Sequence, residues 1–325
     1  MRRIRRRFGS TSLLLKGFWK NIRPKIGSMS GTYWIKPVHC RDSRFEDVAG
    51  LMAVHSQDLL DELFHTAKSV KEEIYGNRIV LFAPLYISNL CSNECLYCAF
   101  RRSNKEAIRR ALNPDEIWQE TKILLRQGHK RVLMVAGEAY PGSGIDYVLE
   151  SIDAIYGAEE NGSRIRRVNV NLAPLSVEDF RRLKERNIGT FQLFQETYHR
   201  PTYGRGHLAG PEKNLDWRAS SFDRAMQAGI DDVGMGLLYG LYGWRFETLA
   251  LMAHIAHLEE RFGVGCHTIS VPHRTGHRVG FGLPAAVHLE RSRFSQACRH
   301  IAPCRAVHGH YHVHSGKTGY PAADA

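Results

Sequence analysis

Segments typical of β-strands alternate with helical segments along most of the chain, and this alternation constrains the fold more than any other feature. The predicted strands are Arg78–Asn89, Arg131–Glu138, Arg166–Pro174, Thr190–Glu196, Asp231–Leu241 and His267–Pro272. The predicted helices between them are Asn113–Gly128, Gly144–Tyr156, Ser176–Gly189, Ser221–Ala228 and Phe246–Gly263. Such alternation predicts parallel strands with helical crossovers, in either a doubly wound sheet or a barrel.

Local signals support the predicted helices. Asn113 is suited to cap a helix that has Pro114 at its first position and Gly128 as its stop. Upstream of the first strand, apolar residues recur at helical spacing between Arg44 and Tyr75. We therefore predict that this segment is helical as well.

Polar residues collect near the ends of the predicted strands. Gly137 and Glu138 end the second strand, Asn171 lies on the third, Gln195 and Glu196 end the fourth, Gly234 and Gly236 lie on the fifth, and His267 lies on the sixth. A barrel carries its chemistry at the carboxyl ends of its strands. These residues are therefore the candidates for a functional site.

Three cysteines follow the first predicted strand, in the stretch PLYISNLCSNECLYCAF. Cys91, Cys95 and Cys98 could form a zinc site if a distant His or Cys supplied a fourth ligand. Alternatively, three thiolates could hold a four-iron cluster and leave one iron without a protein ligand. An open position distinguishes a reactive metal site from a structural one, and a small molecule could then bind that iron.

The composition, with 43% hydrophobic and 24% charged residues, is that of an ordinary soluble protein, and no apolar run approaches the length of a membrane span. The net charge is +12, but nine Lys/Arg without any acid lie in residues 1–28, and seven against two acids lie in residues 273–325. The residues between are nearly neutral and show no basic stripe. We therefore expect neither nucleic acid nor a membrane as a partner.

The two ends differ from the body of the chain. Residues 1–28 form a basic extension, which is either a targeting peptide or the product of a start codon assigned too early, because Met29 follows. Residues 29–77 are predicted to hold N-terminal helices, and residues 78–272 six βα units. Residues 273–325 show no helix or strand period and hold eight of the 17 histidines.

The C-x3-C-x2-C spacing, with Tyr97 before the third cysteine, resembles that of radical S-adenosylmethionine (SAM) enzymes. Over Lys71–Pro272, phrases such as FQETYHRPTY and VGCHTISVP are similar to the tyrosine-lyase branch, which includes the [FeFe]-hydrogenase maturase HydG and the thiamine-biosynthesis enzyme ThiH. The phrases RRVNVN and GIDDVGMG are more similar to HydG. The resemblance implies an α/β fold of the radical SAM type, a partial (βα) TIM-like barrel with the cysteine loop after the first strand.

The same resemblance implies roles for individual residues. Cys91, Cys95 and Cys98 would hold a [4Fe-4S] cluster whose open iron binds SAM. The cofactor-binding residues would be Tyr97, Gly137, Glu138, Asn171, Gly234 and Gly236, with Glu138 near the SAM amino group. The catalytic residues would be Gln195 and Glu196, facing the pocket, and His267, near the substrate. For Glu138 and Glu196, the alternative is an acidic side chain that is merely solvated at a loop or strand end. For His267, the alternative is a histidine whose hydrogen bonds are satisfied within the core.

The implied reaction is cleavage of the Cα–Cβ bond of L-tyrosine to p-cresol and dehydroglycine by a 5′-deoxyadenosyl radical made from SAM. In HydG a second cluster would convert dehydroglycine into CO and cyanide on iron. The implied partners are an electron donor such as ferredoxin or flavodoxin, and other hydrogenase maturases. The alternatives are a ThiH-type 2-iminoacetate synthase and, in another class, a non-catalytic Fe–S or zinc-binding protein from a truncated gene.

The tail departs from this family pattern. The family continues with two more strand–helix units, and Cys298 and Cys304 do not reproduce the further cysteine motif of HydG. Loss of one base in the codon for Arg293 permits a frame that reads as an apolar helix and a strand ending in Ser-Thr-Arg. We therefore interpret residues 273–325 as frameshifted; a true His-rich metal-binding tail is the alternative. We expect a cytoplasmic protein, or an organellar one if the basic extension is a transit peptide.

Overall fold

A parallel β-sheet forms the centre of the computed structural model, which describes residues 45–142, 144–272 and 310–312. Its strands, in sheet order, are β1 (Ala83–Ser88), β2 (Arg131–Ala136), β5 (Arg167–Asn171), β6 (Phe191–Glu196), β7 (Val233–Leu237), β8 (Thr268–Ser270) and β9 (His310–His312). Sheet order follows chain order, whereas a doubly wound sheet reverses its order at a switch point. The sheet is thus wound in one direction, which confirms the predicted partial barrel.

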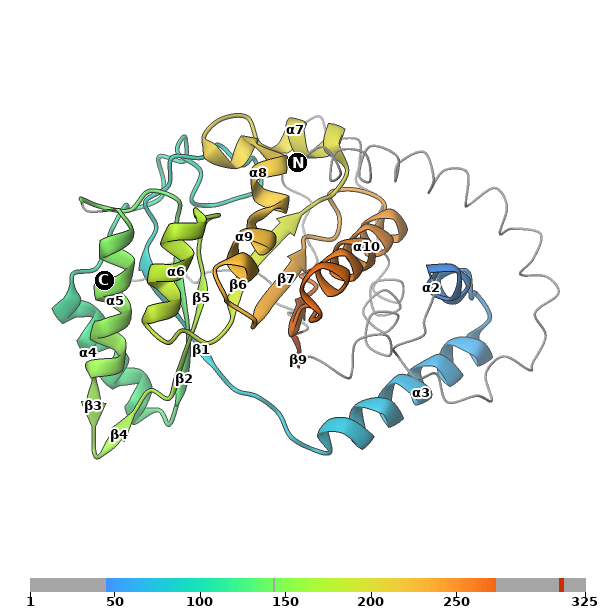
Figure 1. The fold of residues 1–325 in the computed structure, drawn as a ribbon, viewed down its shortest axis with the longest axis horizontal. Coiled ribbons are helices and arrows are strands. Elements are labelled where there is room, and N and C mark those ends of the chain that lie inside the picture. The colour runs from blue at the N-terminus through green and yellow to red at the C-terminus, as the bar shows by residue number, and fades with distance from the viewer. Residues whose placement is uncertain (1–44, 143, 273–309, 313–325) are drawn as a thin grey trace.

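Helical crossovers cover one side of this sheet (Figure 1). They are α4 (Pro114–Arg126), α5 (Ile145–Gly157), α6 (Val177–Glu185), α9 (Ser221–Gln227) and α10 (Trp244–Phe262). Alternate strand residues, such as Val132, Met134, Val168 and Val170, are completely buried in the core between the sheet and the helices. Burial of this apolar side is the main stabilising contribution, because each large aliphatic side chain removed from water contributes roughly 1.5–3 kcal/mol.

The other side of the sheet is more polar. The strand register places Tyr86, Val135, Asn171, Gln192, Gly234 and Thr268 side by side in one row across six strands. These residues alternate with the core residues along their strands, so their side chains point away from the covering helices. In a barrel this is the interior side.

Helix α4 begins where the sequence predicted. The Asn113 side chain accepts a hydrogen bond from the backbone N–H of Glu116 (2.9 Å), and the Glu116 carboxylate accepts one from the backbone N–H of Asn113 (2.8 Å). This reciprocal pair satisfies two backbone donors that the first turn of a helix leaves open. With Pro114 as its first residue, the start of α4 is confirmed.

The segment Arg44–Tyr75 is helical, as predicted, and holds two helices: α2 (Phe45–Met52) closes with turn bonds at Ala53 and Val54, and α3 (Gln57–Tyr75) then begins. Other elements differ from the prediction. Short elements were missed because they span too few residues to show a period. They are the β3–β4 hairpin (Glu159–Glu160 and Ser163–Arg164), α7 (Arg200–Gly206), a 3-10 turn at Pro211–Lys213 and α8 (Leu215–Ala219).

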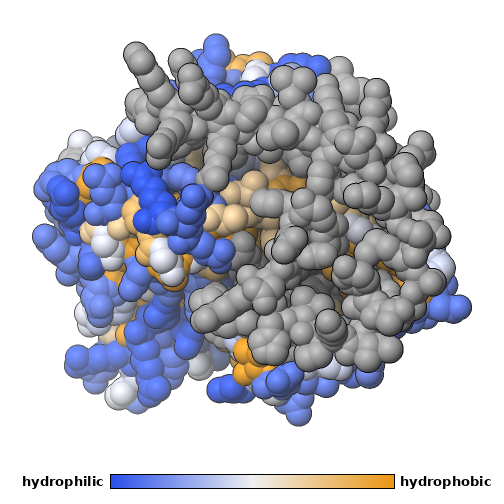
Figure 2. Space-filling model, turned by 45° about the vertical axis from the view of Figure 1, so that its right-hand side comes forward, coloured by the Kyte–Doolittle hydropathy of each residue, from blue (hydrophilic) through white to orange (hydrophobic). Residues whose placement is uncertain are grey.

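The tail shows no strand period in the sequence, but His310–His312 form β9, which pairs in parallel with β8. The rest of the tail, the basic extension and the proposed frameshift concern positions outside the described residues. Within the described part, no helix is both long and apolar enough to cross a membrane. Figure 2 shows apolar surface near the middle of one face, with hydrophilic surface on the described residues around it.

Candidate cluster and cofactor site

The three motif cysteines lie in the loop that follows β1, at the carboxyl edge of the sheet, as predicted. All are free thiols; Cys95 is buried, and Cys91 and Cys98 are half-buried. Burial raises the pKa of Cys98 to about 11, and nearby charges at Glu212 and Cys91 add to the rise. Burial likewise raises the pKa of Cys95. The loop therefore disfavours bare thiolates, which become stable ligands when a metal centre compensates their charge.

The end of β2 supports the first half of this loop, which we call the cysteine loop (residues 91–98). The backbone N–H of Gly137 donates to the carbonyl of Ser88 (2.9 Å), and the Ser92 hydroxyl donates to the carbonyl of Glu138 (2.9 Å). A Cβ atom at Gly137 would lie 2.3 Å from the carbonyl oxygen of Leu90. Only glycine permits this approach of loop and strand.

Glu138 faces the same loop. Its carboxylate accepts a hydrogen bond from the Asn93 side-chain amide. Burial raises the pKa of Glu138, while the Asn93 bond acts in the opposite direction. The predicted Gly137–Glu138 pair is thus adjacent to the cysteine loop, with a half-buried carboxyl group that could bind an ammonium group.

A segment that the sequence did not predict supports the second half of the cysteine loop. Residues 206–209 run antiparallel to residues 94–96, with hydrogen bonds from Leu96 N–H to the Gly206 carbonyl (2.9 Å) and from Glu94 N–H to the Ala209 carbonyl (3.0 Å). The chain returns from α7 to make these contacts. The cysteine loop is therefore fixed from two sides.

Tyr97 and His207 form a hydrogen bond inside this contact. The Nδ1 atom of His207 lies 2.8 Å from the carbonyl of Tyr203, which can only accept, so Nδ1 carries the proton. The Nε2 atom is then an acceptor, and the Tyr97 hydroxyl donates to it at 2.7 Å. Burial lowers the pKa of His207 and raises that of Tyr97, so both groups stay neutral. The predicted cofactor-binding role of Tyr97 stays a prediction.

Arg218 is a buried cation at the site, and sequence reasoning missed it. Its guanidinium donates to the Phe194 carbonyl (2.7 Å), forms an ion pair with Glu212 (2.7 Å) and lies 3.6 Å from Glu196. Burial opposes its charge, but the two carboxylates raise the pKa of Arg218 overall. Burial also opposes ionisation of Glu212, yet Arg218 keeps its pKa lowered. The sequence carries little signal for this cation, because Glu212 and Arg218 lie in elements too short to show a period.

Glu196 ends β6 in an unusual backbone conformation. Its φ is +67°, and the β6–β7 register shifts between Phe194 and Glu196. A left-handed non-glycine residue carries strain and is more frequent at functional sites. Burial raises the pKa of Glu196 to about 8, against the opposing effect of Arg218. Glu196, one of the predicted catalytic residues, thus lies next to the buried guanidinium of Arg218 beside the cysteine loop.

The other predicted residues have different surroundings. Gln195 is completely buried, and neither amide atom has a hydrogen-bond partner among the described residues, so a bound polar group could still satisfy it. Asn171 ends β5 and is half-buried. The side of Gly236 that lacks a side chain is covered by the ring of Phe194, which limits the room predicted there for SAM. The side chain of Gln192 likewise covers the side of Gly234 that lacks a side chain.

His267 does not lie near the cysteines. Its backbone N–H donates to the carbonyl of Val233, the first residue of β7, so it precedes β8 at the amino edge of the sheet. The sequence pattern placed it within the sixth strand, but the strand starts one residue later. The structure therefore does not bring His267 to the site, and its predicted catalytic role has no geometric support.

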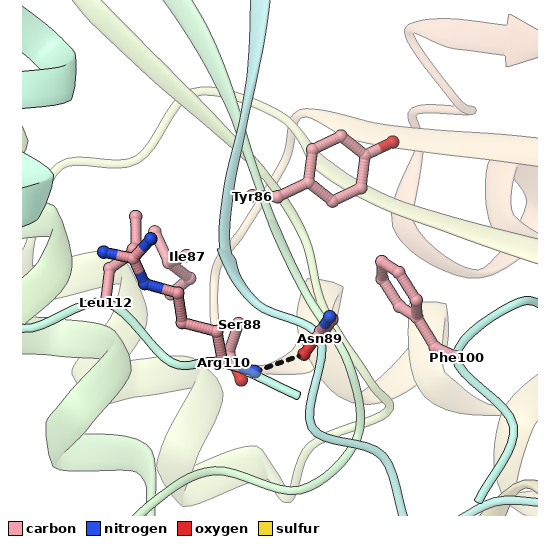
Figure 3. Close-up of a pocket in the computed structure, with 7 residues that line it drawn as sticks. All are labelled: Tyr86, Ile87, Ser88, Asn89, Phe100, Arg110 and Leu112. Atoms are coloured by element: carbon pink, nitrogen blue, oxygen red, sulfur yellow. Dashed lines mark hydrogen bonds between the residues drawn. The ribbon is translucent and has the colours of Figure 1, made fainter. Parts of the chain in front are cut away.

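A pocket of about 280 Å³ adjoins the end of β1 (Figure 3). The rings of Tyr86 and Phe100 pack edge to face on one side of β1, with their centroids 6.0 Å apart. Arg110 lies on the other side of β1. Asn89 accepts a hydrogen bond from the Arg110 backbone (2.7 Å). This pocket lies beside the cysteine loop but is not lined by the cysteines.

Comparison with known proteins decides the family. Residues 85–256, more than half of the chain, match the profile of the radical SAM superfamily. The chain belongs to the radical SAM superfamily. Members use a [4Fe-4S] cluster and SAM, and the residues here fit both groups. Three free thiols occupy one loop, a half-buried carboxyl lies beside them, and the buried Gln195 amide has no partner among the described residues.

Individual relatives indicate which branch of the superfamily this chain is similar to. The chain is 42% identical to a crystal structure of HydG, with a TM-score of 0.79 over 90% of this chain and 65% of that one. It is 37% identical to HydG from Carboxydothermus hydrogenoformans, with a TM-score of 0.80 over 94% and 68%. It is 28% identical to 2-iminoacetate synthase from Escherichia coli over 88% of this chain and 74% of that protein. This chain thus spans about two thirds of the HydG chains and is similar to the predicted tyrosine-lyase branch.

The contact at Gly137 gives a test of the site. We expect Gly137→Ala to destabilise the fold by about 1–3 kcal/mol, because the added methyl group overpacks against Leu90. It should also lower the iron content after anaerobic reconstitution, because the cysteine loop is displaced. Gly157→Ala is the matched control, since a Cβ there meets no atom within 4 Å. Unchanged iron content and melting temperature in Gly137→Ala would contradict the role of this contact.

Proposed function

We propose that this chain is a radical SAM lyase that cleaves the Cα–Cβ bond of L-tyrosine to p-cresol and dehydroglycine, in maturation of an [FeFe]-hydrogenase. The similarity to HydG structures across at least 90% of this chain is the observation that carries the proposal. The bound cluster and SAM supply the 5′-deoxyadenosyl radical for this cleavage. A ThiH-type 2-iminoacetate synthase is the second candidate, favoured by the curated relative that matches 288 residues.

The residues of the site support this chemistry in separate ways. Cys91, Cys95 and Cys98 would hold the cluster. Glu138 offers a carboxyl group to the ammonium of SAM, and Arg218 offers the cation suited to a carboxylate. Burial limits the access of water to these groups, which strengthens each charged contact and protects a radical from side reactions.

The reaction can be tested with reconstituted protein. With SAM, L-tyrosine and a reductant under anaerobic conditions, we expect 5′-deoxyadenosine and p-cresol in equal amounts by liquid chromatography. Cys98→Ala is expected to abolish both products, because the cluster loses a ligand. Formation of 5′-deoxyadenosine without p-cresol would contradict tyrosine cleavage while leaving the superfamily assignment intact.

The two candidate roles differ in the fate of dehydroglycine after cleavage. A maturase would pass dehydroglycine on to CO and cyanide, whereas a 2-iminoacetate synthase would release it. Trapping CO from a productive reaction would favour the maturase, and release of glyoxylate, the hydrolysis product of dehydroglycine, without CO would favour the alternative. Other hydrogenase maturases are expected partners only in the first case.

An electron donor is also part of the proposal, and a basic loop suggests where it binds. Residues 101–110 follow the cysteine loop and contain Arg101, Arg102, Lys105, Arg109 and Arg110 but one acid. Arg102 and Lys105 are exposed, and Ile108 is 88% exposed between them and Arg110. The backbone of Arg102 donates to the carbonyl of Asn93 (2.9 Å), so this surface adjoins the cysteines. An acidic ferredoxin or flavodoxin fits such a surface.

Charge reversal tests this surface. We expect the double variant Arg102→Glu, Lys105→Glu to slow cluster reduction by reduced flavodoxin at least about tenfold at low salt, because electrostatic steering raises association rates by at least that factor. The defect should shrink as salt is added. Reduction by dithionite should not change. Lys68→Glu on α3, far from the cysteine loop (Figure 1), is the control; an equal defect in it would contradict the proposal.

A further inference from the structure

Three metal-binding groups converge beside the cysteine loop in an arrangement that the proposed function does not use. They are the Sγ of Cys95, the Nε2 of His207 and a carboxylate oxygen of Glu212, which all lie within 4.8 Å of one another. Cys95 and His207 are buried, and the Glu212 side chain is 11% exposed. Cys95 lies in the cysteine loop, His207 directly follows α7, and Glu212 lies in the 3-10 turn. Only the fold brings these three residues together.

His207 is held in the orientation of a metal ligand. Its Nδ1 donates to the Tyr203 carbonyl (2.8 Å), and the ring stacks on that of Tyr203 with centroids 3.8 Å apart. The Nε2 lone pair accepts the hydrogen bond of the Tyr97 hydroxyl, and the Sγ of Cys95 and a carboxylate oxygen of Glu212 lie within 4.8 Å of this nitrogen. Metal-binding histidines almost always donate their second ring N–H to a carbonyl or carboxylate in this way.

Glu212 is oriented in the same manner. Arg218 binds one of its carboxylate oxygens (Oε1, 2.7 Å), which leaves Oε2 at 2.8 Å from the Sγ of Cys95. The Asn93 side chain lies 3.4 Å from Oε2 as well. Carboxylates that bind metals are themselves commonly hydrogen-bonded by outer groups, and Arg218 has this place here.

We propose that the chain without its cluster binds one Zn²⁺ ion through Cys95, His207 and Glu212. A thiolate, an imidazole and a carboxylate suit zinc better than magnesium or calcium, and three protein ligands leave a fourth position for water. Binding releases the Cys95 thiol proton to solvent, and the Tyr97 hydroxyl leaves Nε2. The ion uses the second cysteine of the motif, so zinc and the [4Fe-4S] cluster exclude each other.

This site goes beyond the proposed lyase activity, and its test needs neither SAM nor tyrosine. Zn²⁺ alone is titrated into the full chain prepared without cluster, in competition with a chromophoric chelator. We expect one equivalent to bind. Glu212→Gln and Cys95→Ser should each weaken binding at least about tenfold, as changes around metal sites commonly do. Cys91→Ser and Cys98→Ser should leave it unchanged.

Cobalt gives a second readout that does not depend on affinity. Co²⁺ in the same site should show the thiolate-to-metal charge-transfer absorption of one cysteine, and Cys91→Ser should retain it. Circular dichroism verifies that each variant is folded, and Glu212→Gln keeps the size of the side chain if Cys95→Ser fails to fold. Equal loss of zinc in Cys91→Ser, Cys95→Ser and Cys98→Ser with no loss in Glu212→Gln would overturn the proposal, as would no stoichiometric binding.

Discussion

The close contact between the cysteine loop and the end of β2 is the constraint on which the site depends. Gly137 allows the Leu90 carbonyl to approach where any side chain would collide, and the antiparallel contact of residues 94–96 with residues 206–209 fixes the loop from the other side. Preorganisation of this kind matters because a metal centre needs its ligands within a narrow geometry before it binds. The parallel sheet supplies the rigid edge that makes both contacts possible.

Buried charge is the second organising feature. Arg218 has two carboxylates, Glu212 and Glu196, within ion-pair distance, in a region from which water is largely excluded. An unpaired buried charge would cost several kcal/mol, so these groups must be satisfied together. The cost is acceptable at a site that binds a charged cofactor, since SAM brings an ammonium and a carboxylate of its own. The same groups create the ligand set that suits zinc, so loading with the correct metal becomes a competition at Cys95.

The sequence predicted the sheet well, because long strands and helices carry strong periods. The cap at Asn113, the cysteine loop after β1 and the Gly137–Glu138 pair were all readable from local patterns. The segment from α7 to α8 was not, because elements of five to seven residues show no period and their stability comes from tertiary contacts. That segment carries His207, Glu212 and Arg218, so the groups that pack against the second half of the cysteine loop were missed. His267 was already the first residue of the predicted sixth strand, at its amino end, and only the family resemblance suggested a catalytic role for it.

The most direct test of the central claim, that the cysteine loop holds a four-iron cluster with one iron open to SAM, combines metal analysis with electron paramagnetic resonance. After anaerobic reconstitution and reduction, we expect about four irons and four sulfides per chain bound at this motif. The resonance spectrum should change when SAM is added, because SAM binds the open iron. A chain that holds zinc but no iron after reconstitution, or a cluster whose spectrum ignores SAM, would contradict the claim.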